Sequence, residues 1–162
     1  MADTNTALVS EEVLDDLQGR FLTFNIGKVL YGIELLHVIE IISIQPITRI
    51  PNLPGYIKGI INLRGKVVPV IDVRLKFGQE ERAHDGKTCI VIVMVNQMSV
   101  GLIVDSVAEV AAVGQDQSSA PPEFGPLGDN RYLCSIAQSG KNVILNIDIE
   151  KFFQNDLQCA SV

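Results

Sequence analysis

Short apolar runs rich in valine and isoleucine recur along this chain, with glycine or proline between them. Such runs, spaced about ten residues apart and without long amphipathic stretches, are typical of an all-β barrel or sandwich. The pattern predicts about ten strands, five in each half of the chain. The clearest strand pairs are 20–26 with 29–33, 57–63 with 67–73, 89–95 with 98–104, and 132–137 with 141–147.

The turns between paired strands are short. Gly27-Lys28 has its glycine first, as a type II′ hairpin turn prefers, and Asn96-Gln97 joins the corresponding later pair. Arg64-Gly65-Lys66 forms a third hairpin, and its second strand contains Pro69. Because proline cannot donate to a strand ladder, we expect that strand to lie at a sheet edge or to be bulged there.

Four further segments connect or follow the strands. Periodicity fits 34–42 as either a short helix or a strand, and we expect a helical turn at 34–38 followed by a strand from 39. The proline- and glycine-containing stretches 51–55 and 115–130 are predicted loops, and 79–87 is a charged connector. A short helix is expected from 150 to 153.

The chain repeats itself once. At an offset of 69 residues, and without a gap, 21–26 aligns with 90–95 and Gly32 with Gly101. A repeat of this length predicts two similar sub-barrels that share one core. The other aligned pairs, some reached after a slip of a few residues, are Val38 with Val107, Glu40 with Glu109, Tyr56 with Tyr132, Arg64 with Ser139, Gly65 with Gly140, and Asp72 with Asp148.

The length of 162 residues fits one domain, which buries roughly 70% of its unfolded surface without needing a metal or a disulfide. We expect this domain to span 20–154, with repeat halves at about 20–78 and 88–153. Residues 1–19 would form a flexible N-terminal tail, and 155–162 a C-terminal tail.

Charge and cysteine content exclude several classes of protein. A net charge of −6 argues against a nucleic-acid partner, because such proteins concentrate basic residues on one face. The odd set of Cys89, Cys134 and Cys159 fits a reducing compartment, with the first two as small apolar filler in strands. The longest apolar run, 89–95, is too short to insert into a membrane, and no secretory signal precedes it. We therefore expect a cytoplasmic protein.

The sequence lacks the residues that a catalytic, metal or cofactor site needs. His37 and His84 are far apart, and Gly86-Lys87-Thr88 lacks the earlier glycine of a phosphate-binding loop. Asp72 recurs in the repeat as Asp148, which favours a role in holding turn amides over a role in catalysis. The apolar content, with a mean hydropathy of +0.27, instead indicates contact surfaces and therefore a binding function.

The hairpin turn needs its glycine, but it does not need Arg64, which the second half replaces with Ser139 in this alignment. Arg64 is either a solvated charge or a fork of donors directed at a carboxylate. Glu40 is the candidate acceptor, although its recurrence as Glu109 suggests that it also serves the fold.

The stretch 56–74, with its Asn-Leu-Arg-Gly turn followed by Val-Pro-Val-Ile-Asp, closely resembles the signature of the CheW family, the coupling proteins of bacterial chemotaxis. The resemblance covers roughly residues 20–153. Its other matching segments are Phe24, Tyr31-Gly32-Ile33, Val38-Ile39-Glu40-Ile41, Thr48-Arg49-Ile50, Val104-Asp105-Ser106-Val107 and Asn146-Ile147-Asp148.

This resemblance implies two intertwined five-stranded SH3-like barrels with no enzymatic activity and no cofactor. Its implied partners are the cytoplasmic tip of methyl-accepting chemoreceptors and the regulatory domain of the histidine kinase CheA, within membrane-associated receptor arrays. It places receptor binding at Val38, Glu40 and Arg64, supported by Gly59, Asn62 and Gly65, beside an apolar groove between the barrels. It also makes Glu40 and Arg64 an expected ion pair.

Three other functions remain open on the sequence. The same adaptor role occurs in twitching-motility and surface-sensing pathways, which the residues do not separate from chemotaxis. A barrel that binds a small ligand and a small β-barrel hydrolase belong to different classes. The hydrolase would need convergent histidines or carboxylates around a concave site.

Overall fold

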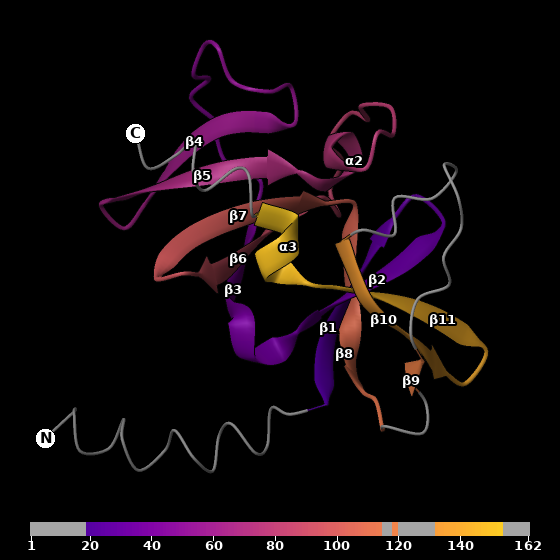
Figure 1. Ribbon diagram of the computed structural model, residues 1–162. Helices are drawn as coiled ribbons and strands as arrows, with labels where there is room; N and C mark the ends of the chain where they lie inside the picture. The colour runs from indigo at the N-terminus through magenta and orange to yellow at the C-terminus, as the bar shows by residue number, and fades with distance from the viewer. Residues whose placement is uncertain (1–18, 115–117, 120–131, 154–162) are drawn as a thin grey trace, which may run out of the picture.

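The computed structural model describes residues 19–114, 118–119 and 132–153, and these residues are mostly β-strand (Figure 1). They form a six-stranded sheet of order β8-β1-β2-β11-β10-β9 and a five-stranded sheet of order β3-β6-β7-β5-β4. The predicted all-β class is confirmed. The elements are β1 (Arg20–Ile26), β2 (Val29–Glu34), the 3₁₀ turn η1 (Leu35–His37), β3 (Val38–Ser43), β4 (Ile57–Leu63), β5 (Lys66–Asp72), α2 (Val73–Lys76), β6 (Cys89–Val95), β7 (Met98–Val104), β8 (Ser106–Ala112), β9 (Ser118–Ser119), β10 (Leu133–Ser139), β11 (Asn142–Ile147) and α3 (Ile149–Phe153).

The predicted strand pairs agree with the structure to within a residue or two. Gly27 opens the first hairpin turn with a positive φ of 62°, and Asn96 and Gln97 take φ values of 49° and 66° in the later one. The helical turn expected at 34–38 is present as η1, and the terminal helix as α3. The prediction missed α2, because it extended the preceding strand through Val73. The expected tails and most of the 115–130 loop lie outside the described residues.

The strand that contains Pro69 does not lie at a sheet edge, contrary to the prediction. It is β5, which lies between β4 and β7, and the register shift of this hairpin is on β4 between Ile57 and Gly59. Pairing with β7 begins only at Val70. Pro69 therefore precedes the parallel ladder, so its missing N–H is tolerated inside the sheet.

The two halves of the repeat exchange strands. In Figure 1 the indigo strands β1 and β2 lie in one sheet with the orange strands β8 to β11, while β3, β4 and β5 lie in the other sheet with β6 and β7. Equivalent parallel pairings join them, between β2 and β11 and between β5 and β7. Each sheet is therefore built from both halves, which is the intertwined arrangement implied by the sequence.

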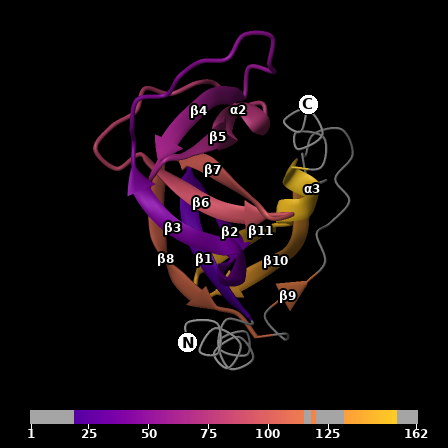
Figure 2. The same cartoon turned by 90° about the vertical axis from the view of Figure 1, so that its left-hand side faces the viewer.

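In each sheet the chain leaves one edge strand and next pairs at the opposite edge. After β3 the chain returns to β4, where Thr48 and Ile60 exchange two backbone hydrogen bonds of 2.9 Å. After β8 it returns to β10 through the short strand β9. In Figure 2, β4 and β5 of the five-stranded sheet lie toward the top and β1, β8 and β9 of the six-stranded sheet toward the bottom.

The core has a shared part and two local parts, the smaller of which lies in the six-stranded sheet and contains Ala111, Ala137 and Ile144. The shared part contains side chains from both sheets and from α3, among them Phe24, Val91 and Phe152. A second cluster, which includes Val68 and Ile92, fills the inside of the five-stranded sheet. The helices of the described part of the chain are too short to cross a membrane.

Candidate functional site

Arg64 and Glu40 form a two-pronged ion pair. The guanidinium nitrogens Nη1 and Nη2 of Arg64 donate to the two carboxylate oxygens of Glu40 at 2.7 and 2.9 Å. Glu40 is on β3 and Arg64 is in the β4–β5 turn, 24 residues later. The side chain of Glu40 is 22% exposed and that of Arg64 75% exposed. The pairing expected from the sequence is therefore present at the protein surface.

The backbone at Arg64 is in a conformation that suits glycine. Leu63 pairs with Lys66, so Arg64 and Gly65 are the two turn residues, with φ values of 54° and 83°. The Oδ1 atom of Asn62 accepts the N–H of Gly65 at 3.0 Å and so supports the turn. A non-glycine residue in this left-handed region costs about 1–2 kcal/mol. Such strain tends to persist where the side chain has a task.

The structural counterpart of Arg64 in the second repeat is Gly140, so the sequence alignment with Ser139 is wrong. Ser139 ends β10 opposite Asn142, which leaves Gly140 as the first turn residue, with a φ of 63°. The error arose because the two turn glycines were aligned with each other, whereas Gly65 is the second turn residue and Gly140 the first.

Gly59 places the β4–β5 hairpin against the chain that follows β3. Its φ is 142°, and a Cβ at this position would collide with the carbonyl oxygen of Thr48. Only glycine allows the Thr48–Ile60 pairing at this distance. The pairing helps to hold β4, and with it the Arg64 turn, beside β3.

A groove of about 220 Å³ lies beside the ion pair. Its floor includes the buried side chains of Val68 and Ile92, and exposed Ile39 and Met94 border it. The remaining lining residues are Glu40, Leu63, Arg64, Lys66 and Ser99. All of these belong to the five-stranded sheet or to its β4–β5 turn, so this groove is not the one expected between the two barrels.

Val38 does not line this groove. It starts β3, two residues before Glu40, and it is half-buried against the shared core. Of the three receptor-binding positions expected from the sequence, the structure therefore brings together Glu40 and Arg64. The groove residues contributed by β6 and β7, Ile92, Met94 and Ser99, were not singled out from the sequence, because they are far from the signature segment.

The six-stranded sheet has the equivalent strands but different side chains at most of the groove positions. In that sheet the hydroxyl of Thr23 donates to the carbonyl oxygen of Glu109 at 2.6 Å and accepts the N–H of Glu109 at 3.0 Å. Thr23 is the counterpart of Ile92, so a polar contact with β8 replaces an apolar floor. Met94 is further replaced by Asn25, Leu63 by Ser139, Arg64 by Gly140 and Lys66 by Asn142, whereas the counterparts of Ile39, Val68 and Ser99, which are Ala108, Ile144 and Leu30, are apolar.

The aspartates considered for catalysis have structural roles. Asp72 accepts the N–H of Leu75 at the start of α2, and Asp148 accepts those of Glu150 and Lys151 in α3. Burial raises the pKa of the Asp72 carboxyl above its usual value.

The carboxylate of Asp105 forms ion pairs with two arginines. Its Oδ2 accepts hydrogen bonds from Arg74 at 2.6 Å, from the N–H of Gly27 at 2.7 Å and from Arg82 at 3.1 Å. These contacts tie α2 and the charged connector to the β1–β2 turn, and so join the two sheets.

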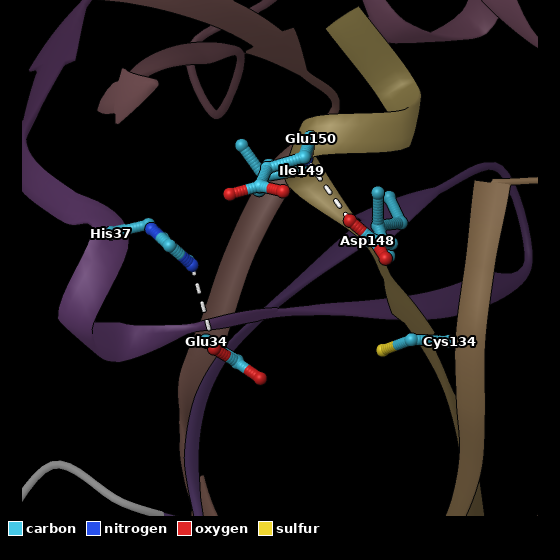
Figure 3. Close-up of a pocket in the computed structure, with 7 residues that line it drawn as sticks. Glu34, His37, Cys134, Asp148, Ile149 and Glu150 are labelled. Atoms are coloured by element: carbon cyan, nitrogen blue, oxygen red, sulfur yellow. Dashed lines mark hydrogen bonds and ion pairs between the residues drawn. The ribbon is translucent and has the colours of Figure 1, made fainter. Parts of the chain in front are cut away.

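A second cleft of about 220 Å³ contains acidic side chains (Figure 3). In this cleft His37 Nε2 lies 3.4 Å from Glu34 Oε2. The carboxylate of Asp148 accepts a backbone N–H of α3. No group of three metal-ligating side chains occurs within the part of the chain that the structure describes. Cys134 also borders this cleft and is exposed, so it is not apolar filler as predicted, whereas Cys89 is half-buried. Cys159 lies outside the described residues.

Comparison with known proteins gives consistent results. The model of the CheW-like domain matches residues 20–157. The chemotaxis protein CheW of Klebsiella aerogenes is 36% identical over 150 residues, which cover 93% of this chain and 90% of the relative. CheW of Treponema pallidum is 32% identical over 88% of this chain and 86% of the relative.

A solved structure is also similar. The crystal structure of the scaffolding protein TtCheW from Thermoanaerobacter tengcongensis has 34% sequence identity and a TM-score of 0.78, and the match covers 84% of this chain and 92% of that one. The family model, the relatives and the intertwined fold agree with the signature around Arg64. The chain therefore belongs to the CheW-like family.

Proposed function

We propose that the protein is a non-enzymatic adaptor that couples chemoreceptors to the histidine kinase CheA in chemotaxis. The receptor tip would bind at the groove beside Glu40 and Arg64, and the regulatory domain of CheA at another surface. The adaptor would thereby be recruited to membrane-associated arrays. The supporting observation is that the apolar groove of the five-stranded sheet is bordered by the Glu40–Arg64 ion pair, whereas the equivalent positions of the six-stranded sheet have Gly140 in place of Arg64 and Thr23 in place of Ile92.

The groove suits a protein side chain better than a metabolite. Small-molecule sites usually enclose roughly 300–1,000 Å³, whereas this groove measures about 220 Å³ and opens on the surface. Its apolar floor and polar border match the mode in which an amphipathic helix places an apolar side chain into a groove. This size weakens the alternative of a ligand-binding barrel.

The ion pair would position the groove wall. An exposed pair contributes only about 0.2–1 kcal/mol to folding, so we assign its role to recognition and not to stability. Because both carboxylate oxygens of Glu40 are held, the pair fixes β3 relative to the β4–β5 turn.

The test is a reconstitution of receptor, CheA and adaptor with the Arg64→Ala variant. We expect the variant to fold and to lose most of the receptor-dependent kinase activation. Lys141→Ala, in the matching hairpin of the second repeat, is the control and should activate the kinase like the unmodified protein. Full activation by a folded Arg64→Ala variant would reject the receptor site. A failure of the unmodified protein to activate CheA would reject the adaptor role itself.

A further inference from the structure

Lys66 is the uncompensated charge of the groove. Glu40 is neutralised by Arg64, and among the described residues no carboxylate forms an ion pair with Lys66. Lys66 pairs with Leu63 across the turn, and both line the groove. The groove is thus locally positive in a chain whose net charge is −6.

We propose that Lys66 selects the partner, by pairing with a carboxylate next to the apolar side chain that enters the groove. The inference rests on the proposed function and names the chemistry of the segment that the groove accepts. On a helix, an apolar residue and an acidic residue three or four positions apart lie on the same face. A partner helix with this spacing would place one side chain over Val68 and Ile92 and the other at Lys66.

The surroundings of Lys66 favour a carboxylate over a phosphate. Arg64, the other cation of the groove, already has two guanidinium nitrogens committed to Glu40. One flexible ammonium group remains, which provides a point charge, whereas phosphate sites usually combine several donors. The equivalent position in the six-stranded sheet is Asn142, and Lys141 beside it is a turn residue, so no cation takes the place of Lys66 there.

An exposed charge at the rim of an interface acts mainly on specificity and on the association rate, and salt weakens it. Lys66 and the apolar floor therefore predict different salt responses. Loss of the Lys66 contact should matter at low ionic strength, and loss of the Met94 contact at any ionic strength.

The experiment measures binding of the full chain to a purified cytoplasmic chemoreceptor fragment, by calorimetry at low and high salt. Lys66→Glu should weaken binding at low salt about tenfold or more, whereas Lys66→Arg should bind within about twofold of the unmodified protein. Lys66→Gln should bind with little salt dependence. Met94→Ala should weaken binding equally at both salt concentrations. Lys141→Glu, with the same change of charge in the second hairpin, is the matched control and should have little effect.

A reciprocal experiment locates the partner group. Acidic residues of the receptor fragment are replaced by lysine one at a time, and restored affinity for Lys66→Glu identifies the facing carboxylate. If Lys66→Glu binds no worse than Lys141→Glu while Arg64→Ala is impaired, the role of Lys66 is overturned and the receptor site stands. If the unmodified protein does not bind the fragment, the inference and the receptor site are both rejected. Thermal unfolding of each variant confirms that it is folded.

Discussion

Arg64 and Gly140 hold the same first turn position in equivalent hairpins, with φ values of 54° and 63°. Glycine is therefore sufficient for a positive φ at the first turn position, as Gly140 shows. In the other hairpin an arginine has a similar φ, and its side chain reaches a glutamate on β3. The β4–β5 turn therefore does not need the arginine side chain, and the role of Arg64 lies in its contact with Glu40.

We predict that Arg64→Gly is more stable than Arg64→Ala by about 1 kcal/mol, because only glycine adopts this φ without strain. Both variants lose the ion pair, so both should fail to couple receptors to the kinase. Chemical denaturation measures the first effect and kinase activation the second. Equal stability of the two variants would contradict the strain at this turn.

Gln97 allows backbone strain to be tested at a position outside the proposed binding site. Asn96 and Gln97 both have positive φ, as in a type I′ turn, for which asparagine followed by glycine is preferred. Gln97→Gly should raise the unfolding free energy by about 0.5–1 kcal/mol, which corresponds to a few degrees in Tm. Gln97→Ala keeps the strain and serves as the control. A lower Tm for Gln97→Gly would rule out this turn geometry.

Gly59→Ala should destabilise the protein by about 1–3 kcal/mol or more, because the new Cβ would force Thr48 away from β4. The matched control is Gly55→Ala, since a Cβ at Gly55 meets nothing within 4 Å. Thermal unfolding should show a large loss for the first variant and little change for the second. Similar melting curves would exclude the close approach of Thr48 and Gly59.

Asp105→Asn should lower the unfolding free energy by about 3 kcal/mol, because it leaves the partly buried guanidinium of Arg74 without its counter-charge. Urea titration measures the loss, and Glu80→Gln, in the exposed connector, controls for removal of a negative charge. If Asp105→Asn is no less stable than the control, Asp105 does not hold the two sheets together.

Asp72 should make the protein less stable as pH rises. Burial raises its folded-state pKa above the ordinary value for an aspartate, so the folded chain binds more protons than the unfolded chain between the two pKa values. Its contribution to stability therefore falls as pH increases through the raised pKa. Asp72→Asn can still accept a hydrogen bond at the start of α2, and it should remove this part of the pH dependence in denaturation measurements.

Asp85 provides a control of opposite sign for this pH profile. Its pKa is lowered, chiefly by the hydrogen bond from the Lys87 N–H, so its contribution is lost as pH falls through the lowered folded pKa. Asp85→Asn should therefore reduce the loss of stability in acid. If both variants changed the pH profile in the same direction, the origin assigned to the Asp72 shift would be wrong.

Local chemistry made most of the strands and turns predictable. Apolar runs with flanking glycines predicted the hairpins. The recurrence of Asp72 as Asp148 predicted that these carboxylates bind backbone N–H groups, as they do at the starts of α2 and α3. The helix α2 was missed because four residues carry too little periodicity, although Asp72 before Val73 is an N-cap signal. Pro69 was misplaced because the sequence does not show where the parallel ladder with β7 begins.

The candidate site was only partly predictable. The family signature indicated Glu40 and Arg64. The groove residues Met94 and Ser99 come instead from the β6–β7 hairpin, much further along the chain. Only the exchange of strands between the halves brings that hairpin beside Lys66. The one-residue error at Ser139 has a local cause, since a glycine can serve either position of a two-residue turn.

The exchange of strands also has a consequence for proteolysis. A single cut in the connector between α2 and β6 would leave two fragments, each contributing strands to both sheets. Neither fragment contains a complete sheet. The fragments therefore cannot separate without breaking the parallel pairings β2–β11 and β5–β7, one in each sheet. A protein nicked there should migrate as one particle in native conditions and as two bands only after denaturation.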